Sequence, residues 1–84
     1  MVRKSAYQDI QNILYTHFSG QEDARIRSFL HVLSVENPQM YQMLEMRFKH
    51  RQQMSQIVQA MNVENERAIQ KRLQKTFIRL KQYL

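Results

Sequence analysis

The sequence predicts an all-α protein of five short helices, because of its composition, its few chain breaks and the spacing of its apolar residues. One Gly and one Pro in 84 residues leave little scope for hairpins or long loops. The abundant residues Gln, Met, Leu, Arg and Lys favour helix instead. We expect a single domain over 1–84, made of a helical hairpin at 5–34 and a helix-turn-helix DNA-binding unit at 38–84.

The first predicted helix covers about 6–18, where apolar residues recur every three or four positions and therefore share one face. Ser5 and Gln8 have capping-box spacing at its start. Gly20 suits the left-handed conformation that commonly ends a helix. The expected inward-facing residues of this helix are Ala6, Tyr7, Ile10, Ile13, Leu14 and Phe18.

The second predicted helix covers about 22–33, and Ser19 and Glu22 repeat the capping-box spacing before it. We expect the first two helices to complete the core beneath the C-terminal unit, because three short helices alone bury little surface. Their alternative role is a docking surface for RNA polymerase or for a second copy of the chain. The expected buried residues of the second helix are Ile26, Phe29, Leu30 and Leu33.

Asn37 and Pro38 mark the clearest helix start, since Asn is a strong N-cap and Pro is tolerated at the first helical position. The third predicted helix covers about 38–50, and a fourth covers about 54–61, too short to persist without packing. Five Met between positions 40 and 61 favour core filling, with an adaptable binding groove as the alternative. The expected inward-facing residues of these two helices are Met40, Tyr41, Leu44, Phe48, Met54, Ile57, Val58 and Met61.

A break at 62–65 precedes a fifth predicted helix, which runs from about Glu66 to the end of the chain. Its apolar stripe and its basic, amide-rich side lie on opposite faces at 100° per residue. Ile78 falls on the polar side, where with Tyr83 it is either a single exposed residue or the seed of a homodimer contact. The expected core residues are Ile69, Leu73, Phe77, Leu80 and Leu84. The expected outward residues are Arg67, Lys71, Gln74, Lys75, Ile78 and Gln82.

The basic charge is concentrated in the second half of the chain. Residues 1–46 carry four Lys or Arg against five acids, whereas residues 47–84 carry nine against two, a balance of +7. This asymmetry favours a polyanionic partner for the C-terminal half, and a solvated basic surface is the alternative. A membrane-surface role for the last helix is disfavoured, since its apolar stripe is narrow and lacks Trp. RNA binding is disfavoured because no aromatic platform stands among the basic residues.

Several function classes are not expected from this sequence. The absence of Cys removes disulfides and thiolate sites and fits a reducing cytoplasm. No apolar run is long enough for a transmembrane helix. His17, His31 and His50 are scattered without partners at metal-ligand spacing, so packing or surface roles are expected rather than metal binding. We expect neither an enzyme nor a cofactor, because no phosphate loop, nucleophile motif or paired acids occur.

A short helix, a tight turn and a longer helix with a basic outer face are typical of a helix-turn-helix. In that unit the longer, recognition helix meets base edges in the major groove, where Arg and Lys reach guanine or phosphate and Gln pairs with adenine. Double-stranded DNA is therefore the expected partner. The candidate DNA-binding residues are Asn65, Arg67, Gln70, Lys71, Gln74 and Lys75, with Arg47, Lys49 and Arg51 as candidates for phosphate contact.

The segment at about 38–80 also carries a recognisable sequence pattern. Leu44-Glu45-Met46-Arg47-Phe48 is followed by Ile57-Val58, Met61-Asn62-Val63, Ile69, Arg72-Leu73 and Leu80. This pattern resembles region four of bacterial sigma factors and the sigma-like late-gene activators of phages. Asn62 stands where that family usually has Gly, a change that Asn tolerates. Gln53 replaces the usual Ser or Thr cap, and the turn before Ile69 is one residue longer.

The resemblance implies sequence-specific DNA binding in bacterial or phage transcription, with about 65–75 meeting the groove. Nothing here resembles the domain that recognises the −10 element, so a complete sigma factor is not expected. The resemblance instead implies a free-standing regulator or one part of a split factor, acting with RNA polymerase or a second regulatory chain. The alternative is a sigma-like interaction module that binds polymerase or another regulator without contacting DNA.

Overall fold

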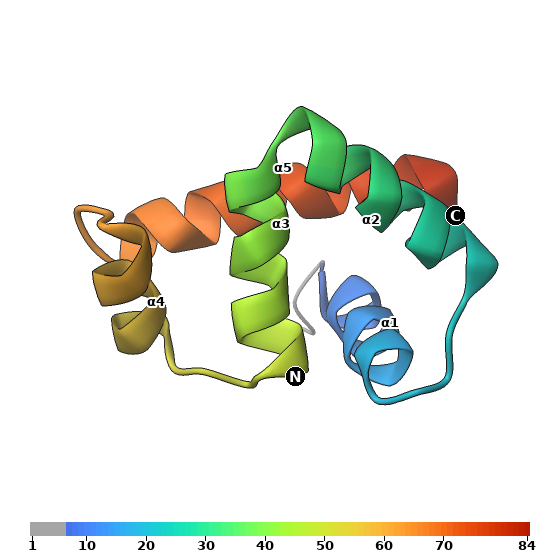
Figure 1. The fold of residues 1–84 in the computed structure, drawn as a ribbon, viewed down its shortest axis with the longest axis horizontal. Coiled ribbons are helices and arrows are strands. Elements are labelled where there is room, and N and C mark those ends of the chain that lie inside the picture. The colour runs from blue at the N-terminus through green and yellow to red at the C-terminus, as the bar shows by residue number, and fades with distance from the viewer. Residues whose placement is uncertain (1–6) are drawn as a thin grey trace, which may run out of the picture.

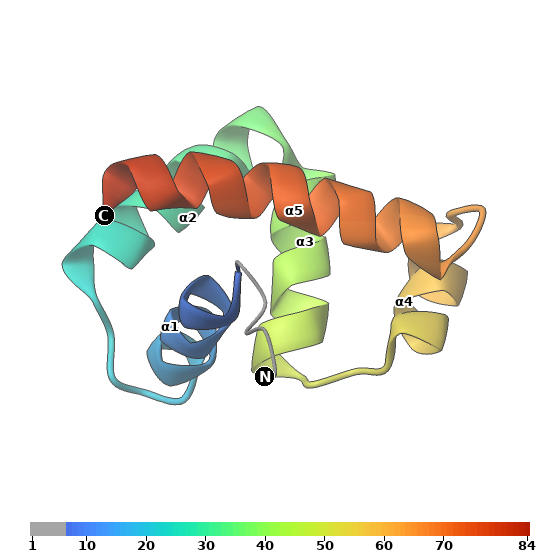
Figure 2. The same cartoon turned by 180° about the vertical axis from the view of Figure 1, so that it is seen from behind.

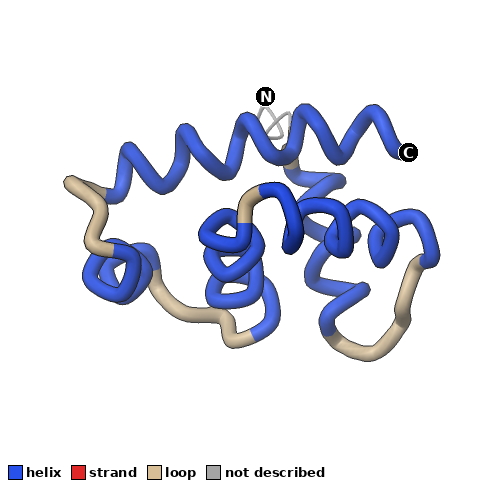
Figure 3. The backbone as a smooth tube through the Cα atoms, turned by 45° about the horizontal axis from the view of Figure 1, so that its top comes forward, coloured by secondary structure: helices blue, strands red, loops and turns tan. Residues whose placement is uncertain are grey.

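The computed structural model describes residues 7–84, and within this range all regular secondary structure is helical, as the sequence predicts (Figure 3). The predicted cap at Ser5 and the predicted start at Ala6 lie outside the described residues. The elements are α1 (Gln8–Phe18), α2 (Ala24–Glu36), α3 (Pro38–Leu44), the π-helical turn η1 (Glu45–Lys49), α4 (Met54–Met61) and α5 (Glu66–Tyr83).

The longest helix, α5, lies across the others and forms one side of the molecule (Figure 2). Its N-terminal end packs against α4, and its later turns pack against α1 and α2. Every helix contributes to one apolar core, which confirms that the first two helices complete it. The buried apolar residues are Ile10, Leu14, Ile26, Phe29, Leu30, Leu33, Met40, Met43, Leu44, Phe48, Ile57, Ile69, Leu73, Phe77 and Leu80.

Helices α1 and α2 follow each other in the chain, but each packs mainly against later elements. Helix α1 packs against η1 and α5, and α2 packs against α3 and α5 (Figure 1). Between α1 and η1, the ring of Tyr15 meets that of Phe48 edge-on, with centroids 4.8 Å apart. The two helices of the segment expected as a hairpin therefore each pack mainly against the C-terminal helices rather than against each other.

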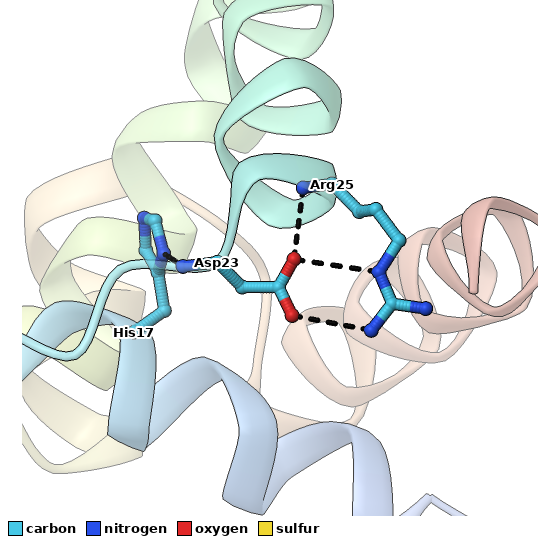
Figure 4. A network of polar contacts seen from close by, with 3 residues as sticks. All are labelled: His17, Asp23 and Arg25. Atoms are coloured by element: carbon cyan, nitrogen blue, oxygen red, sulfur yellow. Dashed lines mark hydrogen bonds and ion pairs between the residues drawn. The ribbon is translucent and has the colours of Figure 1, made fainter.

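The α1–α2 connection is fixed by polar contacts that the sequence pattern does not reveal. The imidazole Nδ1 of buried His17 accepts a hydrogen bond from the backbone N–H of Asp23 at 3.2 Å (Figure 4). The carboxylate of Asp23 in turn accepts from the N–H of Arg25 at 2.8 Å and caps α2. The expected cap at Ser19 with Glu22 is wrong, because Asp23, the last residue before the helix, reaches the free N–H groups of its first turn.

Helix α3 starts as predicted, with Pro38 at its first turn and Asn37 as its N-cap. The Asn37 carboxamide accepts a hydrogen bond from the N–H of Met40 at 3.2 Å. The helix then widens into η1, where the N–H of His50 donates to the carbonyl of Glu45 at 3.0 Å. Met43 is buried although it was not expected on the inner face, because α3 has α2 on one side and α4 on another.

Candidate nucleic-acid interface

The connection between α4 and α5 is held by two asparagines. Asn62 adopts the left-handed conformation at φ 53° and ψ 48°, as its position at the end of α4 predicts. Val63, half-buried against the core, donates its N–H to the carbonyl of Val58 at 3.1 Å. Asn65 is the N-cap of α5, and its side chain accepts from the N–H of Ala68 at 3.0 Å. These contacts fix the direction in which α5 leaves α4.

The start of α4 is supported from within its own first turn. The backbone N–H of Gln53 donates to the side-chain carbonyl of Gln56 at 2.9 Å. Ile57 is fully buried, and Met54 is half-buried against the core. The side-chain amide of Gln56 therefore accepts from the backbone N–H of Gln53, which stands where the family usually has a Ser or Thr cap.

Helix α5 presents the predicted polar face to solvent. Its inner face buries Ile69, Leu73, Phe77 and Leu80, together with Thr76, whose hydroxyl donates to the carbonyl of Arg72 at 3.0 Å. The expected core position of Leu84 is wrong, because its side chain is 39% exposed. Helix α5 ends at Tyr83, so Leu84 lies beyond the last helical turn. The exposed candidates on this helix are Arg67, Gln70, Lys71, Gln74 and Lys75.

The structure divides these candidates between three sides of α5. Gln70 and Gln74 line a groove of about 350 Å³ together with Arg47 from η1, so three predicted residues come together there. Lys75 lines a separate groove of about 380 Å³ beside α2 and α3. Arg67 and Lys71 line neither groove and are exposed. The candidates therefore do not all share one face of α5.

The three basic residues expected to add phosphate contacts each have a partner inside the protein. Arg47 is half-buried, and its Nη1 donates to the carbonyl of Gln52 at 3.0 Å, which ties η1 to the loop before α4. Lys49 pairs with Glu45 at 3.6 Å. The guanidinium of Arg51 lies 4.9 Å from the centre of the Tyr15 ring. These contacts give the residues structural roles, and phosphate contact by them stays a prediction.

Positive charge on α5 is largely uncompensated. Within residues 7–84, no ion pair engages Arg67, Lys71 or Lys75. Arg79 is the exception on this helix, because it pairs with Glu36 of α2 at 2.9 Å. Unpaired, exposed cations remain free to replace the counterions of a polyanion.

Two residues at this surface were not expected from the sequence. Arg72 and Arg79 line the same groove as Lys75 and flank it along α5 at spacings of three and four residues. They lie beside the apolar stripe of α5 rather than opposite it. The sequence prediction selected only residues on the opposite face and therefore did not include them. The i, i+3, i+7 spacing of the three cations was the available signal.

The sequence disfavours metal and membrane contacts and leaves a homodimer contact at Ile78 open. The part of the chain that the structure describes holds no cluster of three His, Asp or Glu side chains able to bind a metal ion. Among the helices of residues 7–84, none has the length and apolarity needed to cross a membrane. Ile78 is 51% exposed as expected, whereas the ring of Tyr83 packs edge-on against Phe29, with centroids 5.1 Å apart. A homodimer contact at Ile78 stays a prediction.

Comparison with known proteins adds no relative. No family model, no curated protein and no solved structure matches this chain. A functional proposal therefore depends on the arrangement of α4 and α5 and on the residue pattern that resembles sigma region four.

Proposed function

We propose that this protein binds double-stranded DNA through the outward face of α5 and acts in transcriptional control. One observation carries the proposal: Arg67 and Lys71 lie exposed and unpaired on a helix whose first turn is fixed by the Asn65 cap. Gln70 and Gln74 add amides on one flank. Charged and amide side chains at the start of a recognition helix are the groups that read base edges.

In the proposed complex, α4 and α5 act as a helix-turn-helix. Helix α4 crosses the DNA backbone, and the N-terminal turns of α5 enter the major groove. Arg67 and Lys71 contact guanine or phosphate, Gln70 and Gln74 contact adenine, and Lys75 contacts phosphate. The residue pattern that resembles sigma region four supports a role beside RNA polymerase, either as a free-standing regulator or as part of a split sigma factor.

The competing proposal is an interaction module that binds polymerase or another regulator without touching DNA. One observation favours it: the cations Arg72, Lys75 and Arg79 border a groove with buried apolar residues. The two proposals place their partners on different sides of α5, so they are separable by mutation.

Selection of bound duplexes from a random pool tests the proposal, carried out with and without RNA polymerase. The proposal expects enrichment of one short motif, which disappears when Arg67 and Lys71 are both changed to Ala. Enrichment only with polymerase present assigns a split-factor or co-activator role. No enrichment in either arm would overturn direct DNA binding.

A further inference from the structure

Arg51 adopts a backbone conformation that is uncommon for its residue type. Its φ is 53°, in the left-handed region that Gly prefers and that Asn and Asp tolerate. It lies in the loop that joins η1 to α4, yellow in Figure 1, where the N–H of Gln52 donates to the carbonyl of Met46 at 2.9 Å. Because Gly meets the same backbone requirement without strain, an arginine at this position indicates that its side chain has a role.

The side chain of Arg51 lies against an aromatic ring. Its guanidinium carbon is over the ring of Tyr15 in α1, 4.9 Å from the ring centre. The Tyr15 ring meets Phe48 edge-on at 4.8 Å, and Phe48 meets Phe77 of α5 at 5.9 Å between centroids. Phe48 and Phe77 are buried, so Tyr15 is anchored to the core. Three rings therefore link the position of the guanidinium to α5.

Within residues 7–84, no hydrogen bond or ion pair engages the side chain of Arg51, which is exposed. Its neighbours differ, since Arg47 donates to a loop carbonyl and Lys49 pairs with an acid of its own helix. A guanidinium stacked on a ring keeps its N–H groups at its edge, where they form paired hydrogen bonds with phosphate or carboxylate oxygens. Arg51 is therefore positioned in advance to bind one such anion.

We propose that Arg51 binds a phosphate of the DNA backbone and that Tyr15 is the residue that positions it. This inference rests on the proposed DNA binding through α4 and α5. In that complex α4 crosses the DNA backbone, and Arg51 precedes Met54, the first residue of α4, by three positions. Met54 lines the same groove as Gln70 and Gln74, so the start of α4 lies on the amide flank of α5. A phosphate contact at this point fixes the position of the protein on the duplex and reads no base.

A backbone phosphate suits the surroundings of Arg51 better than a carboxylate of a partner protein does. A stable protein interface buries an apolar centre, whereas a phosphate contact needs only donors and positive charge. Within residues 7–84, the large apolar side chains that are exposed lie on α2 and toward the end of the chain, and none lies in α1, η1, α4 or the loop before α4. These exposed residues are Val35, Ile78, Tyr83 and Leu84.

The test measures the fluorescence anisotropy of two labelled duplexes, one obtained by selection and one of unrelated sequence, with the full chain and its variants. Arg51→Gly removes the side chain and suits the left-handed backbone, so thermal unfolding is expected to stay close to that of the parent. Its affinity is expected to fall by about tenfold for both duplexes, because a phosphate contact does not depend on sequence. The slope of log affinity against log salt is expected to become shallower by about 0.9, the contribution of one phosphate.

Two further single variants make the result specific to this side chain. Arg51→Asn tolerates the same backbone without the charge and is expected to show the same loss of affinity as Arg51→Gly. Lys49→Gln is the matched control, because it removes a nearby charge that already pairs with Glu45. The control is expected to keep the salt slope of the parent. Circular dichroism establishes that each variant is folded.

The positioning role of Tyr15 is tested by a double-mutant cycle. Tyr15→Leu is expected to weaken duplex binding by about threefold when Arg51 is present and to have no further effect in the Arg51→Gly background. A ring that only supports the core would weaken binding equally in both backgrounds, and that result would overturn the positioning role.

An Arg51→Gly protein with the affinity and salt slope of the parent would overturn the phosphate contact. If Arg67→Ala with Lys71→Ala still weakens binding in that case, DNA binding through α5 stands and only the inference about Arg51 fails. Absence of duplex binding by the parent would overturn both proposals together.

Discussion

The side-chain carbonyl of Asn65 accepts a hydrogen bond from the backbone N–H of Ala68 at 3.0 Å, and this contact fixes the first turn of α5. Arg67 stands within that turn, immediately before Ala68. The direction in which the Arg67 side chain projects therefore depends on the Asn65 N-cap, which lies in the connection between α4 and α5. Stability and proposed DNA contact are coupled at this point of the chain.

Replacing Asn65 with Ala is expected to lower the free energy of unfolding by about 1 kcal/mol, because the first turn loses its cap. Asn65→Asp keeps an acceptor at the same place and is expected to stay close to the parent. Urea denaturation followed by circular dichroism measures both variants. An Asn65→Ala protein as stable as the parent would contradict this role.

The left-handed residue Asn62 gives a second prediction. Its φ of 53° is strained for a β-branched side chain, so Asn62→Val is expected to cost about 1–2 kcal/mol. Asn62→Gly is expected to leave stability close to that of the parent, because Gly adopts this conformation freely. Thermal unfolding of the two variants measures this difference. A Gly variant less stable than the parent, together with a Val variant as stable as the parent, would contradict a requirement for the left-handed conformation at this position.

Arg47 is expected to stabilise the loop between η1 and α4. Arg47→Met keeps the length of the side chain but removes the donor to the Gln52 carbonyl, so the free energy of unfolding is expected to fall by about 1–2 kcal/mol. The measurement is urea denaturation, with Lys49→Met as a control that removes one charge at an exposed ion pair. Equal small losses in the two variants would argue against a structural role for Arg47.

The fold follows closely from the sequence where local chemistry is strong. Asn37 with Pro38, Asn62 and Asn65 mark helix ends that the structure confirms, because each residue type has a specific backbone preference. The cap of α2 was misplaced because Ser19 matched a local pattern, while Asp23 is held by the distant side chain of His17. Contacts between elements are not visible in local spacing.

The candidate site is predictable to a similar extent. Periodicity along α5 identifies Arg67 and Lys71 as outward, because a single helix has a fixed angle per residue. It does not identify which residues meet neighbouring helices. The gathering of Gln70 and Gln74 with Arg47 depends on how α1, η1 and α4 lie beside one flank of α5. The gathering of Lys75 with Arg72 beside the other flank depends on the position of α2 and α3.

Acid pH is expected to weaken the start of α2. The Arg25 guanidinium and backbone N–H lower the pKa of Asp23 below its ordinary value of 3.8. A carboxylate with a lowered pKa in the folded state contributes stability above about pH 4 and loses it as the pH falls further. Urea midpoints measured from pH 5 downward are expected to decline less steeply in Asp23→Asn than in the parent. Identical slopes would show that Asp23 does not set this acid sensitivity.

The most direct test of DNA binding through α5 is the affinity for a selected duplex, measured by fluorescence anisotropy over a range of salt. Direct binding predicts that log affinity falls linearly with log salt, with a slope of about −0.9 for each phosphate neutralised. Arg67→Ala with Lys71→Ala is expected to weaken binding by about 1–3 kcal/mol for each base that the removed side chain reads.

The control is Arg25→Ala with Arg27→Ala, which removes the same charge from α2 and is expected to leave affinity close to that of the parent. A decrease in affinity confined to the α5 variant supports DNA binding through this helix. No measurable duplex binding by the parent, or an equal decrease in both double variants, would contradict it.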